Sequence, residues 1–145
     1  MNHVSFNTTN PGFILRSFAG YHDDDIKFFE CETPTSTIQV GVNTVLQINT
    51  ANYVSFLYTG IFIPDTTGLW TFGIKCDDSA LVWIGNKALS LYTNSNATVG
   101  IPGTHPPQTV TGTLSLTRNK QNPIRVIFGN KTGGGILLLR FKRPG

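Results

Sequence analysis

The chain has 145 residues, of which 39% are hydrophobic, 11% aromatic and 13% charged, and its formal net charge is +3. An ordinary soluble domain has about 25% charged residues, so this composition indicates a folded chain with a largely neutral surface and excludes disorder and coiled coils. No apolar run approaches the roughly 20 residues that cross a bilayer, and the start lacks the features of a signal peptide. We therefore predict one domain over 1–145 with a flexible tail at 1–12, no membrane insertion and no signal peptide in this chain.

Short apolar or alternating segments follow one another along the chain, separated by turns rich in Gly, Pro, Asn and Thr. No segment has apolar residues at helical spacing over three turns. Several segments are apolar on both faces, which indicates strands covered on both sides. The pattern predicts an all-β fold, an antiparallel β-sandwich of two sheets. The expected strands are 13–20, 37–48, 53–63, 69–76, 80–85, 109–117, 123–129 and 135–142.

Charge is distributed unevenly along the chain. Five of the eight acids lie between Asp23 and Glu32, and residues 79–145 contain none. The cations of that second half are scattered along expected strands and do not alternate with aromatic residues, so nucleic acid is not an expected partner.

Two cysteines, Cys31 and Cys76, allow either one disulfide or two free thiols. Cys76 falls on the same face of its expected strand as the apolar residues before it, which favours two buried thiols.

Motifs of catalysis are missing from the chain. His3, His22 and His105 are not spaced with a serine, cysteine or carboxylate as in nucleophile motifs, and ordinary exposed histidines are the better interpretation. There is no phosphate-binding or dinucleotide-binding glycine motif, no HExxH and no cysteine-based zinc pattern. The glycine run 133–135 lies between two expected strands and indicates a flexible loop or bulge. No enzymatic activity is expected.

Two groups of adjacent acids are candidate cation sites, because calcium prefers oxygen ligands. Three successive carboxylates at 23–25 would point alternately to opposite sides, which favours a solvated turn over a cation site. Asp77 and Asp78 close an apolar strand and precede another, so they would repel each other and lose hydration, a cost that a divalent cation would offset. A cis peptide would bring both carboxylates to one side of the chain, and an ordinary Asp-Asp-Ser turn is the alternative.

The segment GLWTFGIKCDDSALVWIGNKAL, at 68–89, resembles the central hairpin of the β-sandwich named after the anthrax protective antigen, and more closely its GLEYA and flocculin adhesin branch. GFILRSFAGYHDDDIKFF, VSFLYTGIFIPDTTGLWTF and NPIRVIFGNKTGGGILLLRF are similar to further parts of the family, in the same order and over nearly the whole chain. The pentapeptide that names the GLEYA group is absent. The loop KTGGG is short and has no acidic or aromatic side chain.

The resemblance implies a calcium-dependent carbohydrate-binding site. In the adhesins, the aspartates that match Asp77 and Asp78 are joined by a cis peptide and bind calcium, with an asparagine and backbone carbonyls from the loop that corresponds to 130–134. Two side chains of that loop would face the sugar. The ligand-binding residues so implied are Asp77, Asp78, Asn130, Lys131, Thr132, Gly133 and Gly134, of which the first three would bind the metal.

Two further interpretations of Asn130 together have about the same weight as the ligand role. It could be a turn residue, or it could begin the glycosylation sequon Asn130-Lys131-Thr132.

Two functions of different classes follow. The first is a non-enzymatic, calcium-dependent lectin or adhesin module that binds glycans of a cell surface from outside the cell. The second is a structural or surface-decorating protein of a virion, capsid or other assembly, which the low charge and the missing signal peptide motivate. Its partners would be other subunits of the particle, or of a parent adhesin. An enzyme comes third: the resemblance implies relatives attached to glycosidases as accessory domains, but adjacent Asp77 and Asp78 cannot easily flank a scissile bond.

Overall fold

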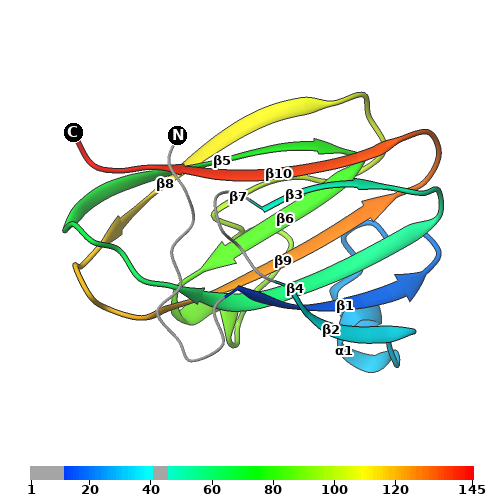
Figure 1. Cartoon of the computed structure of the whole chain (residues 1–145), viewed down its shortest axis with the longest axis horizontal. Helices are drawn as coiled ribbons and strands as arrows, with labels where there is room; N and C mark the ends of the chain where they lie inside the picture. The colour runs from blue at the N-terminus through cyan, green and yellow to red at the C-terminus, as the bar shows by residue number, and fades with distance from the viewer. Residues whose placement is uncertain (1–11, 41–45) are drawn as a thin grey trace.

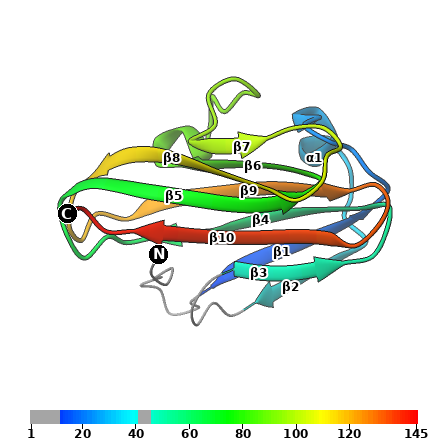
Figure 2. The same ribbon diagram turned by 90° about the horizontal axis from the view of Figure 1, so that it is seen from above.

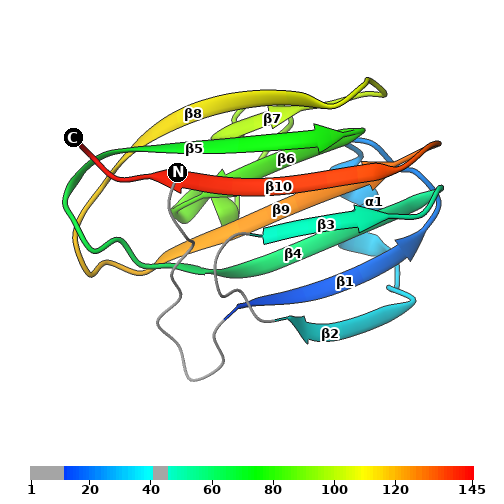
Figure 3. The same cartoon turned by 45° about the horizontal axis from the view of Figure 1, so that its top comes forward.

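The computed structural model describes residues 12–40 and 46–145. Their strands form two antiparallel sheets, one of six strands in the order β2-β1-β4-β9-β6-β7 and one of four in the order β3-β10-β5-β8 (Figure 1). In Figure 3 the four-stranded sheet runs from β8 through β5 and β10 to β3, across the strands of the other sheet. The predicted all-β sandwich is confirmed. The elements are β1 (Phe13–Ala19), α1 (Ile26–Cys31), β2 (Ser36–Val40), β3 (Leu46–Thr50), β4 (Val54–Phe62), β5 (Gly68–Asp77), β6 (Ser79–Ile84), the 3₁₀ helix η1 (Asn86–Ala88), β7 (Val99–Ile101), β8 (Gln108–Leu116), β9 (Asn122–Asn130) and β10 (Gly135–Lys142).

The main core lies between the two sheets. Alternate residues of a strand point to opposite faces, so β5 turns Trp70, Phe72 and Ile74 inward, all at most 2% exposed. Phe62 packs edge-to-face against Trp70 and Phe72 with ring centroids 5.3 Å apart. Each large apolar side chain buried in this way contributes about 1.5–3 kcal/mol to stability.

A second apolar cluster covers the outer face of the six-stranded sheet. All six residues of β6 are buried, because α1 and the segment around η1 cover the face that the main core does not. Trp83 is central to this cluster, and its indole N–H donates to the Thr93 carbonyl (3.0 Å) and to Asn96 Oδ1 (2.9 Å). The six-stranded sheet therefore packs on both faces: one face contacts the four-stranded sheet, and the other contacts α1 and the segment around η1.

Several predictions on local structure were wrong. The expected strand 37–48 is two strands in different sheets, since β2 pairs with β1 and β3 pairs with β10. The sequence analysis missed α1 and β7, which are too short, at six and three residues, to show a periodic pattern. Both cysteines are free, but Cys31 is exposed on α1 and only Cys76 is buried. The expected tail 1–12 lies almost entirely outside the described residues.

In the described part of the chain, four passages between the sheets occur at the same end of the sandwich, on the right in Figure 1: β3 to β4, β5 to β6, β7 to β8 and β9 to β10. The chain leaves β5 in the four-stranded sheet and enters β6 in the six-stranded sheet with only Asp78 between them. It returns from β9 to β10 through residues 131–134. Figure 2 shows α1 at this end as well. None of the helices in the described part of the chain is long and apolar enough to span a bilayer.

Candidate functional site

Asp77 and Asp78 occupy the passage from β5 to β6, and the peptide bond between them is cis, as the family resemblance implies. Asp77 is opposite Ile136 of β10, while Ser79 is opposite Gly129 of β9. The pair is therefore held between the ends of strands from both sheets.

The Asp78 carboxylate is fixed by backbone donors from two loops. Its Oδ1 accepts a hydrogen bond from the His105 N–H (3.0 Å) and its Oδ2 accepts one from the Lys131 N–H (2.8 Å). The residue is 5% exposed. Hydrogen bonds from backbone N–H groups stabilise a carboxylate, and here they also connect the β7–β8 and β9–β10 loops to the acid pair.

Asp77 is in a less favourable environment. Partial burial and the neighbouring Asp78 charge both raise the pKa of its carboxyl group, and His105 acts in the opposite direction. Burial raises the pKa of nearby Tyr21 to about 12, and the charges of Asp23 and Asp78 add to that rise. The carboxylates of the Asp77–Asp78 pair thus lie close to each other and to the Tyr21 hydroxyl, which stays neutral.

Asn130, the last residue of β9, is fully buried. Its amide nitrogen donates to the carbonyls of Ala51 (2.8 Å) and Gly133 (2.9 Å), which fixes the orientation of the amide group. Its Oδ1 is buried without a hydrogen-bond partner. An unpaired buried oxygen costs about 1–3 kcal/mol, so this atom requires an explanation that the fold alone does not supply.

Gly135 makes this position of Asn130 possible. A Cβ atom on Gly135 would overlap Thr50 Oγ1 and would lie 2.7 Å from Cβ and Cγ of Asn130. Only glycine allows so close an approach of the β10 backbone to the Asn130 side chain.

The two other interpretations of Asn130 do not survive. The residue ends a strand and pairs with Val54 of β4, so it is not a turn residue. A glycan would attach to the amide nitrogen, which is buried and donates two hydrogen bonds, so the sequon is inaccessible.

The predicted loop between β9 and β10 is confirmed, and its residues Lys131, Thr132, Gly133 and Gly134 are all exposed. The structure thus brings Asp78 and Asn130 together in the interior and surrounds them with an exposed loop.

Two residues at this end were missed by the sequence analysis. Tyr53 is 55% exposed at φ 52°, and its N–H donates to the Lys131 carbonyl (3.0 Å). An exposed aromatic ring beside a polar site can stack on the apolar face of a sugar.

His105, expected to be ordinary and exposed, is half-buried, and its backbone N–H donates a hydrogen bond to Asp78. The sequence gives no sign that Tyr53 or His105 lies near the acid pair, because this depends on contacts between loops far apart in the chain.

His22 also departs from the prediction. It is half-buried and stacks on Phe28 with ring centroids 3.4 Å apart. His3 lies outside the described residues.

The acidic run 23–25 forms a turn in which the carboxylates do not converge. Asp25 caps α1 by accepting from the Phe28 N–H (3.3 Å), and Asp23 accepts from the Gly103 N–H (2.8 Å). Among residues 12–40 and 46–145, no three His, Cys, Asp or Glu side chains cluster, so the three carboxylates of this run do not form a metal site together. The structure therefore favours the solvated turn.

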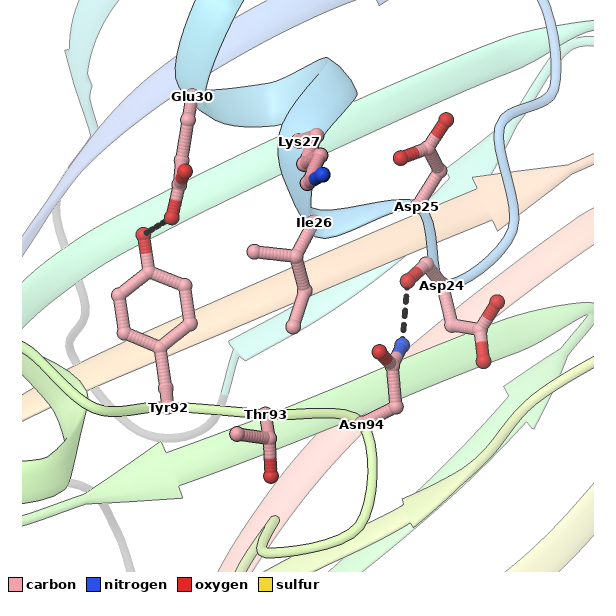
Figure 4. Close-up of a pocket in the computed structure, with 8 residues that line it drawn as sticks. All are labelled: Asp24, Asp25, Ile26, Lys27, Glu30, Tyr92, Thr93 and Asn94. Carbon is pink, nitrogen blue, oxygen red and sulfur yellow. Dashed lines mark hydrogen bonds between the residues drawn. The ribbon is translucent and has the colours of Figure 1, made fainter.

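A groove of about 600 Å³ lies between this turn and the β6–β7 loop (Figure 4). We call it the acidic groove. Its polar groups pair with each other: the Tyr92 hydroxyl donates to Glu30 (2.6 Å), and the Asn94 amide donates to the Asp24 carbonyl. The residues that line it are Asp24, Asp25, Ile26, Lys27, Glu30, Tyr92, Thr93 and Asn94.

Comparison with known families and structures agrees with this geometry. The model of the GLEYA domain family matches residues 54–143, a range that contains the acid pair, Asn130 and the loop after it, although the pentapeptide that names the group is absent. No curated protein is significantly similar in sequence.

Solved structures support the fold. The Epithelial Adhesin 6 A domain from Candida glabrata, solved in complex with Galβ1-3GlcNAc, is 19% identical with a TM-score of 0.70, over 99% of this chain and 85% of that domain. The PA14 domain of the antifreeze protein MpAFP is 11% identical with a TM-score of 0.70, over 92% of this chain and 82% of that domain.

A β-glucosidase from Kluyveromyces marxianus, solved with glucose, is 15% identical with a TM-score of 0.63 over 99% of this chain. The match covers only 19% of that enzyme. These matches lend no support to the hypothesis of a virion or capsid protein.

Proposed function

This chain belongs to the GLEYA domain family, and from that premise we propose that it is a calcium-dependent carbohydrate-binding module of the lectin or adhesin kind. The observation that carries the proposal is the buried, unpartnered Oδ1 of Asn130, whose neighbour in sequence, Lys131, donates its N–H to Asp78 of the acid pair. The proposed ligands are glycans of a cell surface, met outside the cell.

The residues fit a calcium ion. Calcium takes about six to eight oxygen ligands, often a mixture of carboxylates, amide oxygens, backbone carbonyls and waters. Asp77 and Asp78 would supply the negative charge, and Asn130 Oδ1 would supply a neutral oxygen. Each Asp78 oxygen accepts one N–H in the structure and keeps a further lone pair for a metal.

Calcium would supply a Lewis-acidic centre that accepts hydroxyl oxygens of a sugar. The chain itself holds the ligand set in place: the amide nitrogen of Asn130 is fixed by two carbonyls, and the Asp78 carboxylate by two N–H groups. The exposed loop of Lys131, Thr132, Gly133 and Gly134 would contact the sugar, with the Tyr53 ring beside it.

The test is a calorimetric calcium titration of the chelator-treated protein, followed by a glycan array that includes Galβ1-3GlcNAc with and without calcium. Wild type is expected to bind calcium saturably, in roughly the 10⁻⁴ to 10⁻³ M range of extracellular modules. Asp77→Asn is expected to lose this binding.

Asp24→Asn, in the acidic groove, is the matched control, because it removes one half-buried carboxylate, as Asp77→Asn does, and keeps the Asp24 carbonyl that accepts from Asn94. It should bind calcium as wild type does. Sugar retention by the wild type in excess chelator would contradict the proposal.

A further inference from the structure

The outer face of the four-stranded sheet carries unpaired positive charge. Because side chains alternate along a strand, the buried Ile74 and Leu139 leave Lys75 and Arg140 on the outward face, and both are exposed. Lys142, two residues beyond Arg140, is exposed on the same face.

Two of these cations border a hollow of about 360 Å³. Gly73 of β5 lies opposite Arg140 of β10, while Lys75 lies opposite Leu138. Because Gly73 has no side chain, the sheet surface is recessed between the two cations. We call this the basic hollow, and it is lined by Gly73, Ile74, Lys75, Thr109, Leu138 and Arg140.

No carboxylate lines the basic hollow. In the described part of the chain the one ion pair joins Asp65 to Arg143, so Lys75 and Arg140 have no acidic partner. Guanidinium and ammonium groups form strong, charge-assisted hydrogen bonds to carboxylates and sulfates. The Thr109 hydroxyl adds a neutral polar contact, and Leu138 supplies an apolar surface for a sugar ring.

We propose that the basic hollow binds the carboxylate or sulfate group of an acidic glycan, and does so without calcium. The inference goes beyond the calcium site and does not require it. Lys75 precedes Asp77 by two residues on β5, about 7 Å along the strand, so one acidic oligosaccharide can reach both places.

The described residues favour a glycan over nucleic acid. Affinity for the DNA backbone depends on the number of phosphates that cations neutralise, and this face of the described sheet offers three cations. Binding of single strands also uses aromatic rings as stacking platforms, and none lines the basic hollow.

The experiment is calorimetry in excess chelator with three tetrasaccharides: a heparin-derived one with sulfates, a hyaluronan-derived one with carboxylates only, and neutral chitotetraose. The wild type should bind at least one acidic probe and should not bind the neutral one. Which acidic probe binds more tightly identifies the anionic group.

The variants are Lys75→Gln/Arg140→Gln and the matched control Arg118→Gln/Lys120→Gln, which removes the same two charges from exposed positions in the β8–β9 loop. The first should weaken binding about tenfold or more, because it removes both charge-assisted contacts to the anionic group. The control should change it less than twofold. Thermal melting verifies that both variants fold.

Equal weakening in both variants would overturn the proposal, since it would reflect net charge alone. Tighter binding of a 20-nucleotide single-stranded DNA than of either acidic probe would also overturn it. Asp77→Asn should keep its affinity for the acidic probe in chelator, and this result separates the basic hollow from the calcium site.

Discussion

The acidic groove and the Asp77–Asp78 site both contain carboxylates, but they differ in how their polar groups are satisfied. In the groove, Tyr92 is paired with Glu30, and Asn94 is paired with the Asp24 backbone. At the other site, partial burial and the neighbouring Asp78 carboxylate raise the pKa of Asp77, and a buried amide oxygen of Asn130 has no partner.

This difference teaches that volume alone does not mark a binding site. A solvated groove with paired groups is stable as it stands. A buried, unpaired oxygen beside repelling charges is stabilised by an additional partner such as a cation, which is why the Asp77–Asp78 site carries the functional proposal.

The largest expected effect is at Gly135. Gly135→Ala would force its Cβ against Asn130 and Thr50, and overpacking of this kind costs about 1–3 kcal/mol. Urea unfolding should show this loss of stability, and calorimetry should show weaker calcium binding. The matched control is Gly134→Ala, where nothing lies within 4 Å of the added Cβ. Equal effects of the two variants would mean that Asn130 is not held by this contact.

Tyr92→Phe probes the acidic groove. It removes the 2.6 Å hydrogen bond to Glu30 and should lower the free energy of unfolding by about 1 kcal/mol, measured by urea unfolding. Calcium affinity should stay within about twofold of wild type. A large loss of calcium binding would show that the two regions are coupled and would break the comparison.

Asp77→Asn should raise the melting temperature in chelator by about 2 °C, because it removes the repulsion from Asp78. In saturating calcium the order should reverse, since only the wild type gains stability from the ion. Differential scanning calorimetry under both conditions measures this. If Asp77→Asn were less stable than wild type in chelator, repulsion between the Asp77 and Asp78 carboxylates would not destabilise the fold.

The smallest effect concerns Asp65, a carboxylate at the opposite end of β5. Its pKa is lowered, chiefly by the hydrogen bond from Arg143, at 2.8–3.0 Å. A lowered folded-state pKa stabilises the fold above the unfolded value near 4, and this contribution is lost as the pH falls through the folded value.

Asp65→Asn should therefore lower the melting temperature at pH 7 by about 2 °C or less, since the pair is exposed, and by a smaller amount at pH 2. The sign is opposite to that expected for Asp77→Asn in chelator. If both variants shifted the melting temperature in the same direction, the distinction between the paired carboxylate of Asp65 and the unpaired one of Asp77 would be wrong.

The sequence predicted the sheet content and the acid pair well, because both have local signals. The alternation Trp70-x-Phe72-x-Ile74 shows which face of β5 is buried, and two carboxylates between apolar strands are conspicuous in any window. It failed at 37–48, since an apolar segment does not reveal that the chain changes sheets. It also assigned Cys31 to the interior, although the short helix α1 places it at the surface.

The sequence by itself determined the residue types at the site, the strands that carry them and the family. Only the tertiary structure decided that Asn130 is buried and that its amide is oriented by Ala51 and Gly133. It also decided that His105 reaches Asp78, and that Lys75 and Arg140 border one hollow. The physical reason is that the sequence fixes periodicity and chemistry over a few residues, whereas burial, unpaired atoms and the convergence of charges arise from strand register and loop contacts between distant segments.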